Sequence, residues 1–96
     1  MKEKIYLSGN KNNIEKFEYY SNYFKDQYMV INPLDYIDND KKRLFKKLIN
    51  ELMDCQNIFI IDNGNDIEDD ETITEINIAY NFDLKPLFES EIIQGN

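Results

Sequence analysis

The sequence of 96 residues contains no histidine and no tryptophan, and its only cysteine is Cys55. A single cysteine excludes an internal disulfide framework. Without histidine or a second cysteine, the common zinc ligand sets are also excluded. We therefore expect no metal site and no cofactor. We also expect Cys55 to be a small buried hydrophobic residue.

Long apolar segments and an excess of positive charge are lacking as well. No apolar run approaches the ~20 residues that span a bilayer, and residues 1–4 lead into a strand-like run rather than a signal peptide. The chain has 11 Lys and Arg against 19 Asp and Glu, a net charge of -8. Such a balance opposes binding to a phosphate backbone. We expect a cytoplasmic protein that binds neither membranes nor DNA or RNA directly.

The residues that are present suffice for one hydrophobic core. The chain is 42% hydrophobic and 14% aromatic, with seven Tyr and six Phe. A chain of this length fits one domain and leaves no room for a second core. We expect a single domain over residues 1–90, followed by a C-terminal tail over residues 91–96.

Apolar runs alternate with amphipathic segments along the chain. The runs typical of strands lie at 5–8, 28–31, 58–61 and 86–88, and helices are expected at about 13–26 and 41–54 and around a stripe formed by Ile73, Ile76, Ala79 and Tyr80. This alternation predicts an α/β fold, a small Rossmann-like or flavodoxin-like three-layer domain. We expect a four-stranded parallel sheet in the order 2-1-3-4, with the third strand buried on both faces.

Ligands of such sheets gather beyond the carboxyl ends of the strands. The glycine turn after the first strand, at Gly9, could present backbone amides to a ligand, although it could equally be a plain turn between strand and helix. The residues that follow these strand ends, and that we expect to bind a ligand, are Ser8, Gly9, Asn10, Asn32, Asp62 and Gly64.

Asp69 and Glu75 are candidate catalytic carboxylates because one lies in the loop after the third strand and the other in the first turn of the helix that follows. Two carboxylates at a strand-end cleft can serve as an orienting group and as a nucleophile or general base. The segment from Thr72 to Glu75 also has the pattern of a capping box, in which Glu75 would bond the Thr72 amide. On these residues alone, the capping box is the favoured explanation of Glu75.

A basic cluster holds five of the eleven positive charges within seven residues. Such a run is usually the solvated face of a helix, but it could also attract a ligand that carries phosphate. Lys46 is the member that we consider as a ligand contact. The cluster consists of Lys41, Lys42, Arg43, Lys46 and Lys47.

Several short motifs, taken in order, resemble the nucleoside 2-deoxyribosyltransferase-like superfamily, and most closely a small branch common in phage genomes. The motifs are KIYLSG at 4–9, VINP at 30–33, DC at 54–55, IFII at 58–61 and TITE at 72–75, with Ala79 after them. The resemblance implies that Glu75 is a nucleophile for the sugar anomeric carbon, that Asp69 helps to hold the sugar, and that Tyr6 lies beside Glu75. The chain departs from the pattern at Asn10, where the branch usually has proline, and at Lys46, where transferases carry aspartate.

The resemblance implies a protein that binds a nucleoside, a nucleotide or another ribose-bearing metabolite and that cleaves or transfers its N-glycosidic bond. The alternative is a binding protein without catalysis, encoded by a phage, that sequesters a nucleotide signal or blocks a host protein. We also expect a homodimer or larger homo-oligomer, with Tyr19, Tyr23 and Tyr80 as candidate interface residues because aromatic residues are enriched at interfaces.

Overall fold

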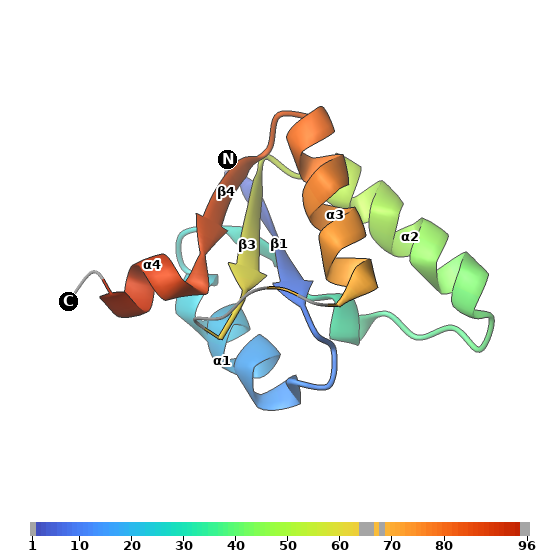
Figure 1. Ribbon diagram of the computed structural model, residues 1–96, viewed down its shortest axis with the longest axis horizontal. Helices are drawn as coiled ribbons and strands as arrows, with labels where there is room; N and C mark the ends of the chain where they lie inside the picture. Colours follow the sequence, from blue (N-terminus) through green and yellow to red (C-terminus); the bar gives the residue numbers. More distant parts are fainter. Residues whose placement is uncertain (1, 64–66, 68, 95–96) are drawn as a thin grey trace.

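The computed structural model describes residues 2–63, 67 and 69–94, in which strands and helices alternate along the chain (Figure 1). The elements in order are β1 (Lys4–Gly9), α1 (Ile14–Phe24), β2 (Met29–Ile31), the short 3₁₀ helix η1 (Pro33–Asp35), α2 (Lys41–Met53), β3 (Asn57–Ile61), α3 (Asp70–Asn81), β4 (Lys85–Phe88) and α4 (Glu89–Gln94).

The four strands form one sheet in the order β2-β1-β3-β4, and every neighbouring pair is parallel. The registers pair Tyr6 of β1 with Ile31 of β2 on one side and with Ile58 of β3 on the other. The fold class and strand order predicted from the sequence are therefore confirmed. The domain is a small Rossmann-like α/β fold.

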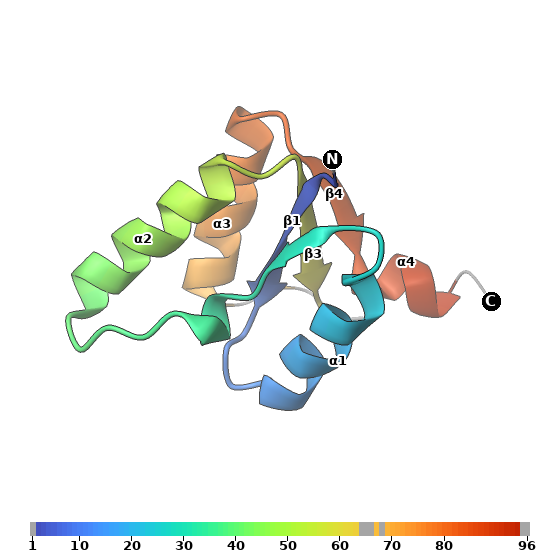
Figure 2. The same ribbon diagram turned by 180° about the vertical axis from the view of Figure 1, so that it is seen from behind.

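Helices cover both faces of the sheet, which gives three layers (Figures 1 and 2). α2 and α3 lie on one face and α1 lies on the other, with α4 beside β4 and β3. Because side chains alternate along a strand, successive residues of β1 and β3 enter opposite cores. One core is built around Tyr6, Leu52, Ile58 and Ile60, and the other around Leu7, Phe17, Phe59 and Ile61.

β3 is the most deeply buried strand, as its unbroken apolar run predicts. All five of its residues are buried. Its neighbour β1 approaches it closely at Gly9, because a Cβ added there would lie 3.0 Å from Ile61 Cβ and 3.2 Å from Ile61 O. Gly9 is therefore needed for the close approach of two strands, and its backbone is buried.

The starts of α2 and α3 depend on aspartate caps. The Asp40 side chain accepts hydrogen bonds from the backbone N–H groups of Lys42 and Arg43, which fixes the start of α2 within the predicted range. α3 begins earlier than the sequence suggested, since Asp69 rather than Thr72 is its N-cap. The predicted stripe of α3 is wrong in part: Ala79 is buried, whereas Ile73 and Tyr80 are 38% and 54% exposed.

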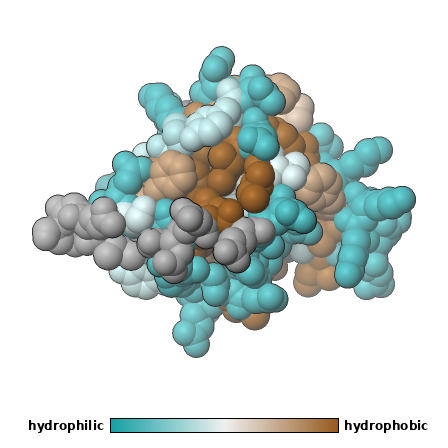
Figure 3. Space-filling model, in the orientation of Figure 1, coloured by the Kyte–Doolittle hydropathy of each residue, from teal (hydrophilic) through white to brown (hydrophobic). Residues whose placement is uncertain are grey.

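Residues 89–94, for which the sequence patterns predict neither a strand nor a helix, form α4 directly after β4. β4 is an edge strand in which Pro86 lies opposite Ile58, and the backbone N–H of Phe88 donates to Glu91 Oε1 at 3.1 Å. On the face of the molecule seen in Figure 3, which has the orientation of Figure 1, hydrophobic residues lie at the centre and hydrophilic residues surround them. Among the described residues, no helix is both long enough and apolar enough to cross a membrane.

Candidate functional site

Glu75 occupies a core position of α3. The helix buries Thr72, Glu75 and Ala79, which follow one another at spacings of three and four residues and so form one stripe. Glu75 is 1% exposed. A carboxylate in such a place costs stability unless hydrogen bonds compensate for the lost water. The position therefore requires donors from the sheet beneath it.

β1 supplies two such donors. Tyr6 donates its hydroxyl to Glu75 Oε2 at 2.5 Å, and Ser8 donates its hydroxyl to Oε1 at 2.7 Å. The two residues are two positions apart on one strand, so both side chains lie on the face that α3 covers. Each carboxylate oxygen thus has its own donor. The structure brings together three predicted site residues, namely Tyr6, Ser8 and Glu75.

Lys11 adds a positive charge at the rim of this cluster. Its Nζ lies 3.7 Å from Glu75 Oε2 and 3.2 Å from Glu71 Oε2. Burial raises the pKa of Glu75 above its usual value, and this effect outweighs the opposing effects of Lys11 and of the hydrogen bonds from Tyr6 and Ser8. Burial, followed by the nearby charge of Glu75, also raises the pKa of Tyr6. Tyr6 is therefore a neutral hydroxyl that donates to Glu75.

Asp69 does not lie in the Glu75 cluster. Its Oδ2 accepts hydrogen bonds from the backbone N–H of Thr72 at 3.0 Å and from the Thr72 hydroxyl at 2.7 Å. The capping box between Thr72 and Glu75 is therefore wrong: Asp69 caps the helix and Glu75 points into the core. Asp69 precedes the first turn of α3 and its carboxylate binds Thr72 in that turn, whereas the Glu75 carboxylate is bound by side chains of β1.

The turn after β1 is stabilised within itself. Asn10 Oδ1 accepts from the backbone N–H of Asn12 at 2.9 Å, and Asn10 O accepts from the N–H of Asn13 at 3.0 Å. This arrangement is an Asx turn on a tight backbone turn. Gly9 and Asn10 thereby position Lys11, which the sequence analysis did not single out.

The other predicted ligand contacts lie elsewhere. Asn32 caps η1 through the N–H of Leu34 and donates to the Ser21 hydroxyl, and it lines a separate hollow of about 420 Å³ against α1. Asp62 accepts from the backbone N–H and the hydroxyl of Ser90 and so joins β3 to α4. Gly64 lies outside the described residues.

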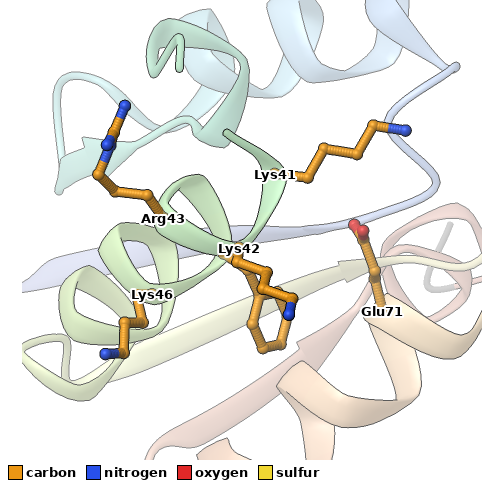
Figure 4. Close-up of a pocket in the computed structure, with 6 residues that line it drawn as sticks. Lys41, Lys42, Arg43, Lys46 and Glu71 are labelled. Carbon is orange, nitrogen blue, oxygen red and sulfur yellow. The ribbon is translucent and has the colours of Figure 1, made fainter. Parts of the chain in front are cut away.

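A hollow of about 620 Å³, which we call the basic groove, opens between the first turns of α2 and α3 (Figure 4). Lys46 is one of its lining residues, but its side chain points away from Glu71, whereas Lys41 and Lys42 extend closer to the space in front of Glu71. The groove is lined by Lys41, Lys42, Arg43, Phe45, Lys46 and Glu71.

A second buried carboxylate, Glu89, was missed by the sequence analysis. It is 1% exposed and accepts hydrogen bonds from Lys16 Nζ at 2.8 Å, from the Tyr20 hydroxyl at 2.7 Å and from the backbone N–H of Asn63 at 2.8 Å. Burial opposes its ionisation, but these three donors together outweigh burial and lower the pKa of Glu89. The available signal was its position directly after the last strand.

No group of three or more His, Cys, Asp or Glu side chains within the described part of the chain is arranged to hold a metal ion. The groups gathered at the site are the Glu75 carboxylate, the hydroxyls of Tyr6 and Ser8, and the Lys11 ammonium. A scan of the chain against protein-family models finds no match, and searches of the curated proteins and of the solved structures find no significant match either.

Proposed function

We propose that the chain binds a nucleoside, nucleotide or other ribose-bearing metabolite at the carboxyl end of its sheet and cleaves the N-glycosidic bond through Glu75. The observation that carries the proposal is the buried Glu75 carboxylate. It lies in the core stripe of α3, where an apolar side chain is usual, and each of its oxygens accepts a hydrogen bond from a hydroxyl of β1. Strained or costly groups of this kind are concentrated at functional sites. The resemblance to deoxyribosyltransferases supports the same residue.

The reaction would proceed in two displacements. One Glu75 oxygen attacks the anomeric carbon, a C–O bond forms, and the C–N bond breaks with its electron pair going to the base, which takes a proton from solvent. Water then attacks the same carbon, the Glu75 carboxylate leaves, and the sugar is released with a hydroxyl group. The net reaction consumes one water for each base released.

The hydrogen bonds from Tyr6 and Ser8 hold the attacking carboxylate in one orientation. Such positioning of a reacting group is a common contribution to catalysis. Lys11 covers the carboxylate in the free protein and favours its ionised form. Access to Glu75 therefore requires the Lys11 side chain to move aside when the ligand binds. Asp69 keeps one oxygen, Oδ1, for a sugar hydroxyl, since its bonds to Thr72 use Oδ2.

The experiment compares the parent with Glu75→Gln and with the control Glu15→Gln. Glu15 is an exposed residue of α1, which covers the opposite face of the sheet from α3, so the control makes the same chemical change outside the site. A thermal-shift panel of nucleosides, nucleotides and ADP-ribose derivatives identifies ligands, because a ligand of the native state raises the melting temperature. Base release is then followed by chromatography.

We expect the parent and Glu15→Gln to release base at equal rates, and Glu75→Gln to bind the ligand but to lose turnover by orders of magnitude. Ligand binding without base release by the parent would instead support the alternative of a protein that only sequesters its ligand. Base release by Glu75→Gln at the parental rate would end the covalent mechanism.

A further inference from the structure

The basic groove contains cations that no acidic side chain of the described residues neutralises. Although the chain carries a net charge of -8, five of its eleven positive charges lie within residues 41–47. Within the parts of the chain that the structure describes, the ammonium groups of Lys41, Lys42 and Lys46 have no acidic partner. Anions are therefore attracted to this part of an otherwise acidic surface.

The acidic groups around the groove are already bound. Asp38 holds Arg43 through two hydrogen bonds at 2.6 and 2.8 Å, and its Oδ2 also lies 3.5 Å from Lys47 Nζ. Asp40 caps α2. Glu71, which points into the groove, pairs with Lys11 at 3.2 Å. The lysines of the groove thus remain available to a ligand, whereas Arg43 does not.

The backbone of α2 contributes little to such a site. Helix N-termini commonly bind anions through their unpaired N–H groups. Here the Asp40 side chain takes the N–H groups of Lys42 and Arg43, and the Asp40 carbonyl takes that of Leu44. An anion in the groove would have to be bound by lysine side chains, so substitution of those lysines tests the site directly.

The groove continues toward Glu75. Glu71, which lines the groove, lies four residues before Glu75 on α3, so the two side chains share one face of the helix and are about 6 Å apart along its axis. Lys11 contacts both carboxylates. A ligand that begins in the groove and extends past Glu71 therefore reaches the Lys11 and Glu75 end.

We propose that the basic groove binds the phosphoryl group of a phosphate ester, through Lys41 and Lys42, and that the organic part of the same ligand extends toward Glu75. The inference rests on the proposed function, because it places the phosphoryl end of the ligand whose sugar would react at Glu75. It narrows the ligand class from any ribose-bearing metabolite to a phosphorylated one.

The walls of the groove favour an ester over inorganic phosphate. Phe45 is half-buried there, and the aliphatic stems of Lys41 and Lys42 form much of the remaining surface. Such walls can cover the apolar part of an organic ligand. The hollow, at about 620 Å³, has the size of a small-molecule site.

The test measures dissociation constants by calorimetry for nucleosides, their 5′-monophosphates and inorganic phosphate. The variant is Lys41→Gln/Lys42→Gln. Its matched control is Lys25→Gln/Lys85→Gln, which removes two positive charges from exposed positions that do not line the groove. Melting curves of both variants check that they are folded, and base release is measured in parallel.

We expect the parent to bind at least one monophosphate about tenfold or more tightly than the matching nucleoside, with a preference that falls as salt is added. The preference should vanish in Lys41→Gln/Lys42→Gln and persist in the control. Inorganic phosphate should bind more weakly than the best monophosphate.

Equal affinities for nucleosides and monophosphates, a preference that survives in Lys41→Gln/Lys42→Gln, or equal binding of inorganic phosphate would each overturn the inference. Base release that depends on Glu75, together with equal affinities, would retain the proposed function and reject the inference. A lysine-dependent preference for the monophosphate, without base release, would retain the inference and reject the proposed function.

Discussion

Glu75 and Glu89 are both 1% exposed, and they lie on opposite faces of the same sheet. Glu75 is bound by side chains of β1 beneath α3, and Glu89 is bound by side chains of α1. Their pKa values are shifted in opposite directions, raised for Glu75 and lowered for Glu89. Both carboxylates are buried, but only Glu89 has enough donors to compensate for the loss of water.

The two residues should therefore give opposite dependences of stability on pH. The raised pKa of Glu75 means that its contribution to stability is complete below the unfolded-state pKa of about 4.3 and is lost as the pH rises through the folded-state value. The lowered pKa of Glu89 means that its contribution is present above the unfolded-state pKa and is lost as the pH falls through the folded-state value.

Urea unfolding of the parent, Glu75→Gln and Glu89→Gln between pH 3.5 and 7 measures both effects. Relative to the parent, Glu75→Gln should gain stability as the pH rises and stay within about 1 kcal/mol at neutral pH. Glu89→Gln should lose stability relative to the parent as the pH rises and be about 1–3 kcal/mol less stable at pH 7. If the stabilities of Glu75→Gln and Glu89→Gln, each relative to the parent, changed with pH in the same direction, the opposite pKa shifts of Glu75 and Glu89 would be contradicted.

Tyr6→Phe should raise the pKa of Glu75 further, because the Tyr6 hydroxyl is a donor that favours the ionised carboxylate. The phenyl ring keeps the packing of the core, so the loss should be that of leaving one buried carboxyl oxygen without its hydroxyl donor, about 1–3 kcal/mol. Carboxyl-carbon NMR reports the titration. The matched control is Tyr20→Phe, which removes the corresponding donor from Glu89 and should leave Glu75 unchanged.

Much of the fold was predictable because its signals are local. The apolar run of β3, Asp40 before α2 and the glycine turn after β1 each fix one element within a few residues. The start of α3 was less certain from sequence, since Asp69, Asp70 and Thr72 are all good N-cap residues and only packing selects among them. A start three residues earlier adds a first turn that the apolar pattern does not indicate.

The site was predicted less completely. Glu75 was singled out, and the family resemblance placed Tyr6 beside it, but Ser8 was expected only to bind a ligand. Tyr6 and Ser8 lie 69 and 67 residues away in the chain, and no local pattern records such contacts. Glu89 was missed because six residues of helix are too few for a periodic signal. Asp69 was predicted to converge with Glu75, but the chain uses it as a helix cap.

Gly9→Ala should destabilise the protein by about 1–3 kcal/mol, the usual cost of an extra methyl group in a closely packed region. The new Cβ would lie 3.0 Å from Ile61 Cβ and 3.2 Å from Ile61 O. Shortening the side chain in Ile61→Ala should not rescue the variant, since both close atoms would remain. Denaturant unfolding of the single and double variants tests this, and an unchanged midpoint for Gly9→Ala would reject the steric argument.

We propose a homodimer that uses the outer face of α1. Tyr19 and Tyr23 are 61% and 50% exposed there, and their rings stack with centroids 6.3 Å apart. Tyr80 lies on α3, in the opposite layer, so a single flat interface does not include all three. Light scattering at high micromolar concentration should give twice the monomer mass of 11.5 kDa.

Tyr19→Ser/Tyr23→Ser should reduce that mass to the monomer value, whereas Tyr80→Ser should leave it unchanged. A parent that is monomeric at the same concentration would rule out the dimer, and a dimer that survives in Tyr19→Ser/Tyr23→Ser would place the interface elsewhere.

The edge strand β4 limits how copies of this chain can associate. Because Lys85 donates its N–H inward to Gln56 O, the N–H positions that face outward are those of Pro86 and Phe88. Proline has no N–H to offer, and that of Phe88 is bound by Glu91. The outer edge of β4 thus presents no backbone donor to an added strand. A protein with such an edge resists edge-to-edge aggregation, so self-association through β4 should not extend its sheet across molecules.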